Sequence, residues 1–201
     1  MPNLTTAYNW AIQWCNEPDV LYSMTGLRNQ YRYGRDSSGY MYFDCSSFIW
    51  FCLQSGGWDV IAADPWFNPN AYNAITTHNM PTWLTNLGWY EADINGTWLA
   101  GDIVWRPYDF LYQGSVGHTE MVYSGGSAQG ITMGAHSDAS DGYAPEDQVS
   151  INPWYTGADR YQKIYRYGST PPEPPGPGPG PTPGKIKKMP FILLRRIYPW
   201  L

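Results

Sequence analysis

Residues 42–52 read Tyr42-Phe43-Asp44-Cys45-Ser46-Ser47-Phe48-Ile49-Trp50-Phe51-Cys52, an apolar helical pattern that begins at a cysteine. The pattern predicts a helix from about Cys45 to Ser55, ended by Gly56-Gly57. A thiol at a helix N-terminus lies beside unpaired backbone N–H groups and the positive end of the helix dipole. Both favour the thiolate, the form that attacks carbonyl carbon. Cys45 is therefore a candidate nucleophile, with a buried structural cysteine as the alternative.

Around this helix, the pattern changes from helical to extended along the chain. A first helix is expected from Thr5 or Thr6, and a short third helix near residues 81–87, whereas residues 21–43 and 58–77 look irregular. Strands are expected at residues 102–105, 118–123, 130–136, 148–151 and 162–167. Helices followed by a meander of strands predict an α+β fold, with N-terminal helices packed on an antiparallel sheet of about five strands.

Composition divides the chain into three parts. Residues 1–168 can form one domain, residues 169–184 are a Pro/Gly-rich linker, and residues 185–201 are a cationic, apolar tail. Residues 1–168 hold seven basic and 16 acidic residues, a net of −9, so they lack the basic surface that nucleic-acid binding requires. The tail is expected to contact an anionic membrane or wall polymer, or else to be a solvated basic tail; its cations are Lys185, Lys187, Lys188, Arg195 and Arg196.

Cysteine content and the start of the chain bear on the compartment. Three cysteines do not make a disulfide framework, and Cys52 is expected to pack as a small core residue. Met1-Pro2-Asn3-Leu4 leads into a helix without a basic start and an apolar run, so we expect synthesis in the host cytoplasm without a signal peptide. The 17% of aromatic residues fit either a sugar-binding surface or a Trp-rich core.

A cysteine hydrolase also needs a base and a group that orients it. His118 follows Gly117 at the start of a strand, where it can face a helix start. His136 ends the next strand and returns beside His118 if the two strands pair, whereas His78 is expected to be structural. A zinc hydrolase is the chemical rival, but neither HExxH nor CxxC spacing occurs. We therefore expect no metal and no other cofactor.

Several short motifs carry a family resemblance across residues 5–168. They are Tyr22-Ser23-Met24, Asp44-Cys45-Ser46-Ser47, Gly101-Asp102-Ile103, Gly117-His118-Thr119 and Tyr165-Arg166-Tyr167. In this order they resemble the NlpC-type branch of the papain-like cell-wall hydrolases, which includes phage endolysins. The resemblance implies a papain-like fold in which helices pack on the sheet.

The resemblance also implies roles for individual residues. Cys45 would be the nucleophile, His118 the general base and acid, and His136 the residue that orients His118. Asp138 and Asn152 remain substitutes for His136, because the stretch from His118 to His136 is longer than in compact family members. Tyr22 would help to bind the oxyanion beside the backbone N–H of Cys45. Asp44 and Ser46 flank the nucleophile on the oxyanion and substrate side, with helix capping as the alternative for Asp44.

The expected function is that of a bacteriolytic phage or prophage peptidoglycan hydrolase acting at the bacterial cell wall. It would cleave an amide bond in the stem peptide, either muramoyl–L-alanine or an internal peptide bond. The alternative is a non-catalytic or virion-associated wall-binding component whose cationic tail docks on a membrane or an assembly.

Overall fold

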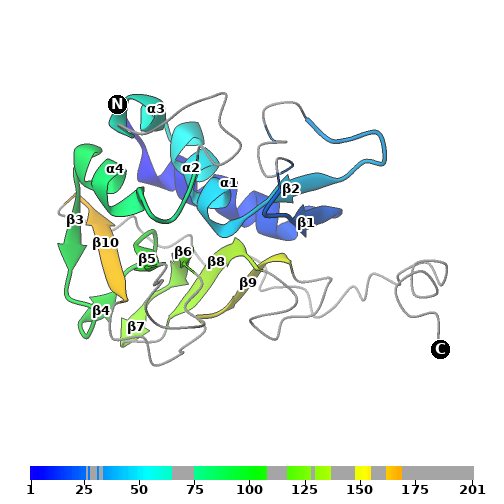
Figure 1. Ribbon diagram of the computed structural model, residues 1–201. Helices are drawn as coiled ribbons and strands as arrows, with labels where there is room; N and C mark the ends of the chain where they lie inside the picture. The colour runs from blue at the N-terminus through cyan, green and yellow to red at the C-terminus, as the bar shows by residue number, and fades with distance from the viewer. Residues whose placement is uncertain are drawn as a thin grey trace.

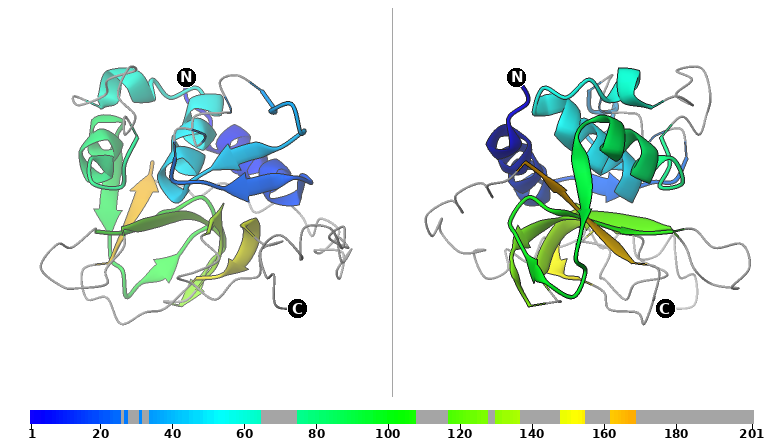
Figure 2. Two further views of the ribbon diagram at one scale, coloured as in Figure 1. Left: turned by 45° about the vertical axis from the view of Figure 1, so that its right-hand side comes forward. Right: turned by 90° about the vertical axis from the view of Figure 1, so that its left-hand side faces the viewer.

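The computed structural model describes residues 1–25, 27, 31, 34–64, 75–107, 117–127, 130–136, 148–154 and 162–168. The predicted linker, the tail and Asp138 lie outside the described residues. The fold is α+β, as the sequence predicts, with helices gathered on one face of a six-stranded antiparallel sheet (Figures 1 and 2). No helix within the described ranges is both long enough and apolar enough to cross a membrane.

The helices and two short strands come first along the chain. They are α1 (Leu4–Asn16), β1 (Val20–Tyr22), β2 (Met41–Phe43), α2 (Cys45–Ser55), α3 (Val60–Ala63) and α4 (Met80–Asn86). The remaining strands are β3 (Trp89–Ala92), β4 (Thr97–Trp98), β5 (Ile103–Arg106), β6 (His118–Ser124), β7 (Gly126–Ser127), β8 (Ile131–Ala135), β9 (Val149–Pro153) and β10 (Lys163–Tyr167). The main sheet has the order β3-β10-β5-β6-β8-β9, while β1 pairs with β2 in parallel and β4 with β7.

The predicted elements agree with the structure where the local signal is strong. The predicted bounds of α2 are confirmed, and all five predicted strands occur, with β3 added as a sixth at the edge. The first helix begins earlier than predicted, at Leu4, because the side chain of Asn3 accepts a hydrogen bond from Thr6 N and caps it. Short elements also lie within stretches predicted to be irregular, namely β1, β2 and α3.

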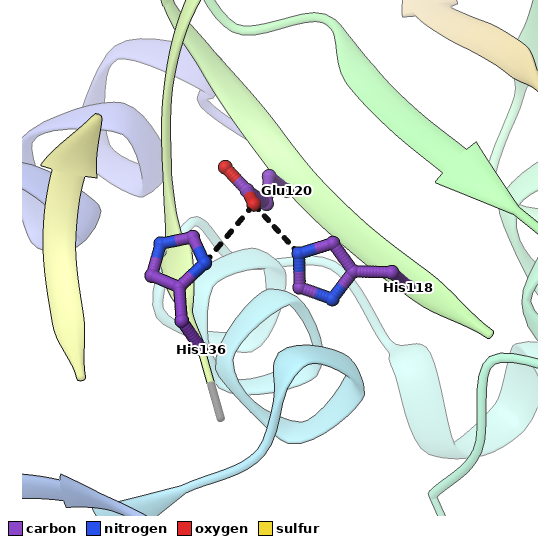
Figure 3. Close-up of side chains that lie close together, drawn as sticks. All are labelled: His118, Glu120 and His136. Carbon is purple, nitrogen blue, oxygen red and sulfur yellow. Dashed lines mark hydrogen bonds and ion pairs between the residues drawn. The ribbon is translucent and has the colours of Figure 1, made fainter. Parts of the chain in front are cut away.

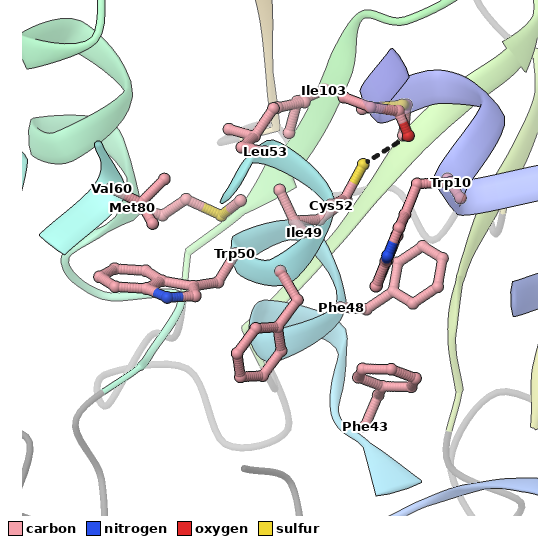
Figure 4. Close-up of a cluster of buried hydrophobic side chains, with 14 of the residues drawn as sticks. Trp10, Phe43, Phe48, Ile49, Trp50, Cys52, Leu53, Val60, Met80 and Ile103 are labelled. Carbon is pink, nitrogen blue, oxygen red and sulfur yellow. Dashed lines mark hydrogen bonds between the residues drawn. The ribbon is translucent and has the colours of Figure 1, made fainter. Parts of the chain in front are cut away.

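The helix α2 forms the centre of the core. Every residue from Cys45 to Leu53 is buried, because α2 packs against α1, against α3 and against strands β6 and β8 (Figure 4). Burial on all sides explains why its apolar residues surround the helix instead of following one stripe. Eight tryptophans are buried in the described ranges, which favours the Trp-rich core over a sugar-binding surface; they are Trp10, Trp50, Trp58, Trp83, Trp89, Trp98, Trp105 and Trp154.

The sheet buries side chains on both of its faces. Along β6, Met121 belongs to the main core with the helices, whereas its neighbour Val122 belongs to a second, smaller cluster. This alternation follows from the two-residue period of a strand. The second cluster contains Trp98, Val104, Val122, Trp154 and Ile164. The face of the sheet opposite the helices is therefore also shielded from solvent, so it can hold a buried polar site.

An ion pair joins two of the motifs that carry the family resemblance. Arg166 on β10 donates from Nε to Asp102 Oδ1 at 2.9 Å and from a terminal nitrogen to Oδ2 at 2.7 Å. Asp102, which is 3% exposed, also accepts from Leu99 N. This two-bond geometry fixes β10 against the turn that precedes β5, so both motifs stabilise the sheet.

Replacing Gly56 with alanine is expected to destabilise the fold by roughly 1–2 kcal/mol. Gly56 has ordinary helical backbone angles. Alanine would therefore stabilise the fold by about 0.4–1 kcal/mol, because it lowers the conformational entropy of the unfolded chain. However, its Cβ would lie 2.6 Å from the buried ring of Trp58 and 2.8 Å from Ala7 Cβ, and such overpacking costs about 1–3 kcal/mol. Urea denaturation measures the difference. Gly126→Ala is the control, because no atom lies within 4 Å of its added Cβ; equal stability of the two variants would contradict this packing.

Candidate active site

Hydrogen bonds fix the start of α2 at Cys45. Asp44 is the N-cap, and its Oδ1 accepts from Ser47 N at 2.6 Å. The hydroxyl of Ser47 in turn accepts from Asp44 N at 2.9 Å, which completes a capping box. Cys45 therefore lies in the first turn of the helix, as predicted, and is 5% exposed. Its Sγ lies 3.9 Å from the carbonyl oxygen of Gly117, next to His118.

The two residues that flank Cys45 hold the helix start and do not face solvent. Ser46 is 2% exposed, and its hydroxyl donates to Asp44 Oδ1 at 2.9 Å and lies 3.3 Å from the carbonyl oxygen of Ile75. Asp44 is 4% exposed and accepts from Ser46 and Ser47. The capping role of Asp44 is therefore confirmed. That Asp44 or Ser46 contacts substrate stays a prediction.

Tyr22 lies at the end of β1, next to the strand that leads into α2. Its backbone pairs with Phe43, two residues before Cys45, and its N–H donates to Gln148 Oε1 at 2.6 Å. The backbone is thus anchored close to the candidate nucleophile. That the Tyr22 hydroxyl assists an oxyanion stays a prediction.

His118 is the first residue of β6, and its ring lies between Cys45 and Glu120. Nε2 of its ring donates to Glu120 Oε1 at 2.6 Å (Figure 3). The thiol of Cys45 also acts on the ring, because its hydrogen bonding and charge raise the pKa of His118. The ring is 14% exposed, whereas Glu120 is fully buried. The face of the ring stacks on Trp154, with centroids 5.6 Å apart and planes inclined by 21°. The contacts with Glu120 and Trp154 thus fix the orientation of His118.

A gap on the neighbouring strand makes room for the carboxylate of Glu120. The pairing of Met121 with Met133 brings Glu120 beside Gly134 on β8. A Cβ on Gly134 would lie 2.6 Å from Glu120 Cγ and 3.1 Å from Cδ. The second carboxylate oxygen accepts a hydrogen bond from the hydroxyl of Thr132. Glu120 is therefore held by shape and by hydrogen bonds on both oxygens.

His136 lies beside His118, as predicted, but Glu120 makes the contact with the His118 ring that we expected of His136. β6 and β8 pair as expected and bring the two histidine rings to 5.7 Å, but Glu120 lies between them (Figure 3). Nδ1 of His136 lies 3.3 Å from Glu120 Oε1, the same oxygen that binds His118. The direct partner of His118 is thus Glu120. Of the substitutes, the Asn152 side chain donates to Ser150, and Asp138 lies outside the described residues.

The period of a strand could have identified Glu120 from the sequence. Residues i and i+2 share one face, so Glu120 points to the same side as His118. An acidic residue between Thr119 and Met121 in an otherwise apolar strand is unusual, since charged side chains are rarely buried unless they are paired. Its contact with His136, however, depends on the pairing of β6 with β8.

The site favours a positive charge on His118. Burial opposes that charge, but the hydrogen bonds and charges of Cys45 and Glu120 outweigh it and raise the pKa of His118 to about 10. Burial would likewise raise the pKa of Glu120, yet the charge of His136, the contacts of His118 and the hydroxyl of Thr132 together lower it. At neutral pH, an imidazolium therefore lies between the sulfur and a buried carboxylate.

These shifts predict how stability depends on pH. The raised pKa of His118 contributes stability that is complete below its ordinary value of 6.5 and is lost as pH rises towards about 10. The lowered pKa of Glu120 contributes stability that is complete above its ordinary value of 4.5 and is lost as pH falls. Urea unfolding across pH should therefore show both contributions between about pH 4.5 and 6.5. Glu120→Gln should weaken the loss of stability at both low and high pH. If the free energy of unfolding kept its native dependence on pH, the paired charges would be contradicted.

Cys52 and His78 lie apart from this group, whereas the Cys15 thiol lies close enough to be affected by the backbone of Gly134 and the charge of Glu120. Cys52 is fully buried, its Sγ donates to the carbonyl oxygen of Ala7 at 3.1 Å, and burial raises its pKa, as expected of a core residue. Burial also raises the pKa of Cys15. All three cysteines are free, and His78 is exposed beside α4. Cys45 is thus the cysteine that has a histidine partner in the described residues.

No protein-family model, curated protein or solved structure matches this chain.

Proposed function

We propose that this protein is a cysteine hydrolase of papain-like fold that cleaves an amide bond in bacterial peptidoglycan. The observation that carries the proposal is the line of contacts from Cys45 through His118 to Glu120. A nucleophile, a base and a group that orients the base are the three parts that covalent amide hydrolysis requires. We assign these parts to the three residues in that order, with Glu120 in place of His136.

The first half of the reaction uses the sulfur of Cys45 and the imidazolium of His118. The sulfur of Cys45 attacks the amide carbonyl carbon and forms a tetrahedral intermediate. The backbone N–H of Cys45 at the start of α2 is a candidate donor to the developing oxyanion, and Tyr22 is the candidate second donor. The imidazolium of His118 then gives its proton to the leaving amine, and the C–N bond breaks to leave a thioester on Cys45.

Formation of the thioester changes His118 from an acid to a base. The pKa of His118 is raised in part by the hydrogen bond and charge of Cys45, and acylation removes both. Its pKa therefore falls once the amine has left, so the neutral ring can take a proton from the attacking water. Glu120 remains in contact with Nε2 through both halves and keeps the ring in one tautomer and orientation.

The choice of peptidoglycan as substrate rests on the family resemblance of the motifs. Arg166 and Asp102, from two of those motifs, are joined by an ion pair in the fold. Cys45 and His118, from two others, lie close enough that the thiol raises the pKa of the ring. Both muramoyl–L-alanine and peptide bonds are amides, so the same chemistry serves either. A phage or prophage endolysin is the biological role that fits this activity, with the cationic tail as its contact to anionic polymers.

Mass spectrometry of purified peptidoglycan after digestion tests this function and identifies the bond. The expected result is release of new amino and carboxyl ends at one position of the stem peptide or of the muramoyl link. The Cys45→Ala protein is the matched control and should release neither. Binding to the wall without cleavage by the native protein would contradict the proposal and favour the wall-binding component.

A further inference from the structure

The site contains a set of metal-ligand atoms that the hydrolytic mechanism does not require. His118 Nε2, Glu120 Oε1 and His136 Nδ1 all lie within 4.8 Å of one another (Figure 3). Glu120 and His136 are at most 1% exposed, and His118 is 14% exposed. Hydrolysis by Cys45 and His118 needs one carboxylate, so the mechanism leaves the second imidazole without a chemical step.

We infer that these three residues bind a zinc-type divalent cation, and that the bound cation switches the hydrolase off. Two imidazoles and a carboxylate are a ligand set that zinc accepts, with a fourth position open to solvent. Bonds of 2.0–2.1 Å in a tetrahedral site place ligand atoms about 3.3 Å apart. The atoms of His136 and Glu120 already lie 3.3 Å apart, and those of His118 and Glu120 need to separate from 2.6 Å.

The surroundings of Glu120 prepare it as a ligand. Its second oxygen accepts from Thr132, and the absence of a side chain on Gly134 leaves it room beside β8. Hydrogen bonds of this kind orient the side chains that bind a metal directly, and their loss typically weakens metal binding about 10–100-fold. The ring of Trp154 stacks on His118 and fixes the plane of that ring. Glu120 and His118 are thus oriented before a cation arrives, and the distances between the ligand atoms adjust when it binds.

Inhibition follows from the proton that the cation displaces, and this half of the inference rests on the proposed function. The cation takes the Nε2 lone pair of His118 and releases the proton that Nε2 shares with Glu120. The metal-bound ring keeps only the proton on its other nitrogen, and losing that one would leave an imidazolate. His118 then no longer donates to a leaving amine, although Cys45 is untouched.

The binding test uses Zn²⁺ with the full chain and a competing chromophoric chelator. We expect one Zn²⁺ per chain, with binding retained in Cys45→Ala and affinity unchanged in His78→Ala, which replaces the exposed histidine outside the cluster. His136→Gln should weaken binding by more than about 100-fold and Thr132→Val by about 10–100-fold. The conservative Thr132→Val change keeps the test valid if His136→Gln unfolds. Full Zn²⁺ affinity in both His136→Gln and Thr132→Val, or loss of binding in Cys45→Ala, would overturn the site.

The inhibition test uses soluble muropeptides and is separate from the binding test. Zn²⁺ should abolish hydrolysis with a midpoint at the dissociation constant measured by binding, and a chelator should restore it. Activity that requires Zn²⁺ would overturn the inhibitory role. A chain that is inactive without metal and still binds Zn²⁺ through His136 would sink the proposed function and the inhibition, and would leave the metal site standing.

Discussion

Cys45→Ala is expected to abolish amide hydrolysis while the domain stays folded. Removing the nucleophile from a comparable triad costs on the order of 10⁶ in kcat, because no other group can form the covalent intermediate. The change deletes one small buried atom and leaves the capping box of α2 in place, so the domain should stay folded. Release of muropeptides and urea denaturation measure the two effects.

The same variant also reports on the charge of His118. Without the hydrogen bond and charge of Cys45, the pKa of the ring should fall from its value of about 10, which NMR titration can follow. Cys52→Ala is the matched control, because it removes a buried thiol that donates to the carbonyl oxygen of Ala7 and does not contact the site. Hydrolysis by Cys45→Ala at the native rate would exclude the covalent mechanism.

Glu120→Gln is expected to reduce kcat strongly, by on the order of 10³–10⁴-fold. In serine proteases, changing the orienting carboxylate to an amide costs about 10⁴ in kcat, since the histidine then adopts the wrong tautomer. Here the amide would also remove a negative charge that raises the pKa of His118. KM should change little, because Glu120 is fully buried and does not reach substrate.

Gly134→Ala tests the same prediction without removing a titratable group. The added Cβ would lie 2.6 Å from Glu120 Cγ and displace the carboxylate from His118. We expect a loss in kcat of the same direction and a lower pKa of His118, with the variant still folded by circular dichroism. If both variants kept native kcat, Glu120 would be a structural acid, and the search for an orienting group would return to His136.

The sequence identifies α2 and its cysteine because the signals that define them are local. The cap at Asp44 and the stop at Gly56 lie within the helix that they bound, and the predicted bounds agree with the structure. Strands of four or more residues could be located in the same way, with the edge strand β3 as the exception. The two-residue strands β4 and β7 are too short to show any alternation.

The strand period places Glu120 on the same face as His118, but its position between the two histidines depends on the pairing of β6 with β8. The sequence predicts that a hairpin brings His136 beside His118, and this pairing is confirmed. The sequence does not show that Gly134 leaves a space on β8, nor that the side chain of Glu120 fills it. The roles of the linker and of the cationic tail stay predictions, because those residues lie outside the described ranges.

The space beside Gly134 has a consequence for how this site can vary. Glu120 and Gly134 share one volume between two strands, and that volume admits a single side chain. Their substitutions are therefore coupled: a change at either position sets what the other can hold, and single-site effects there will not add. An acid could extend into the same volume from β8 if β6 supplied the glycine. Related sequences could thus carry the acid on either strand and still keep the Cys–His pair.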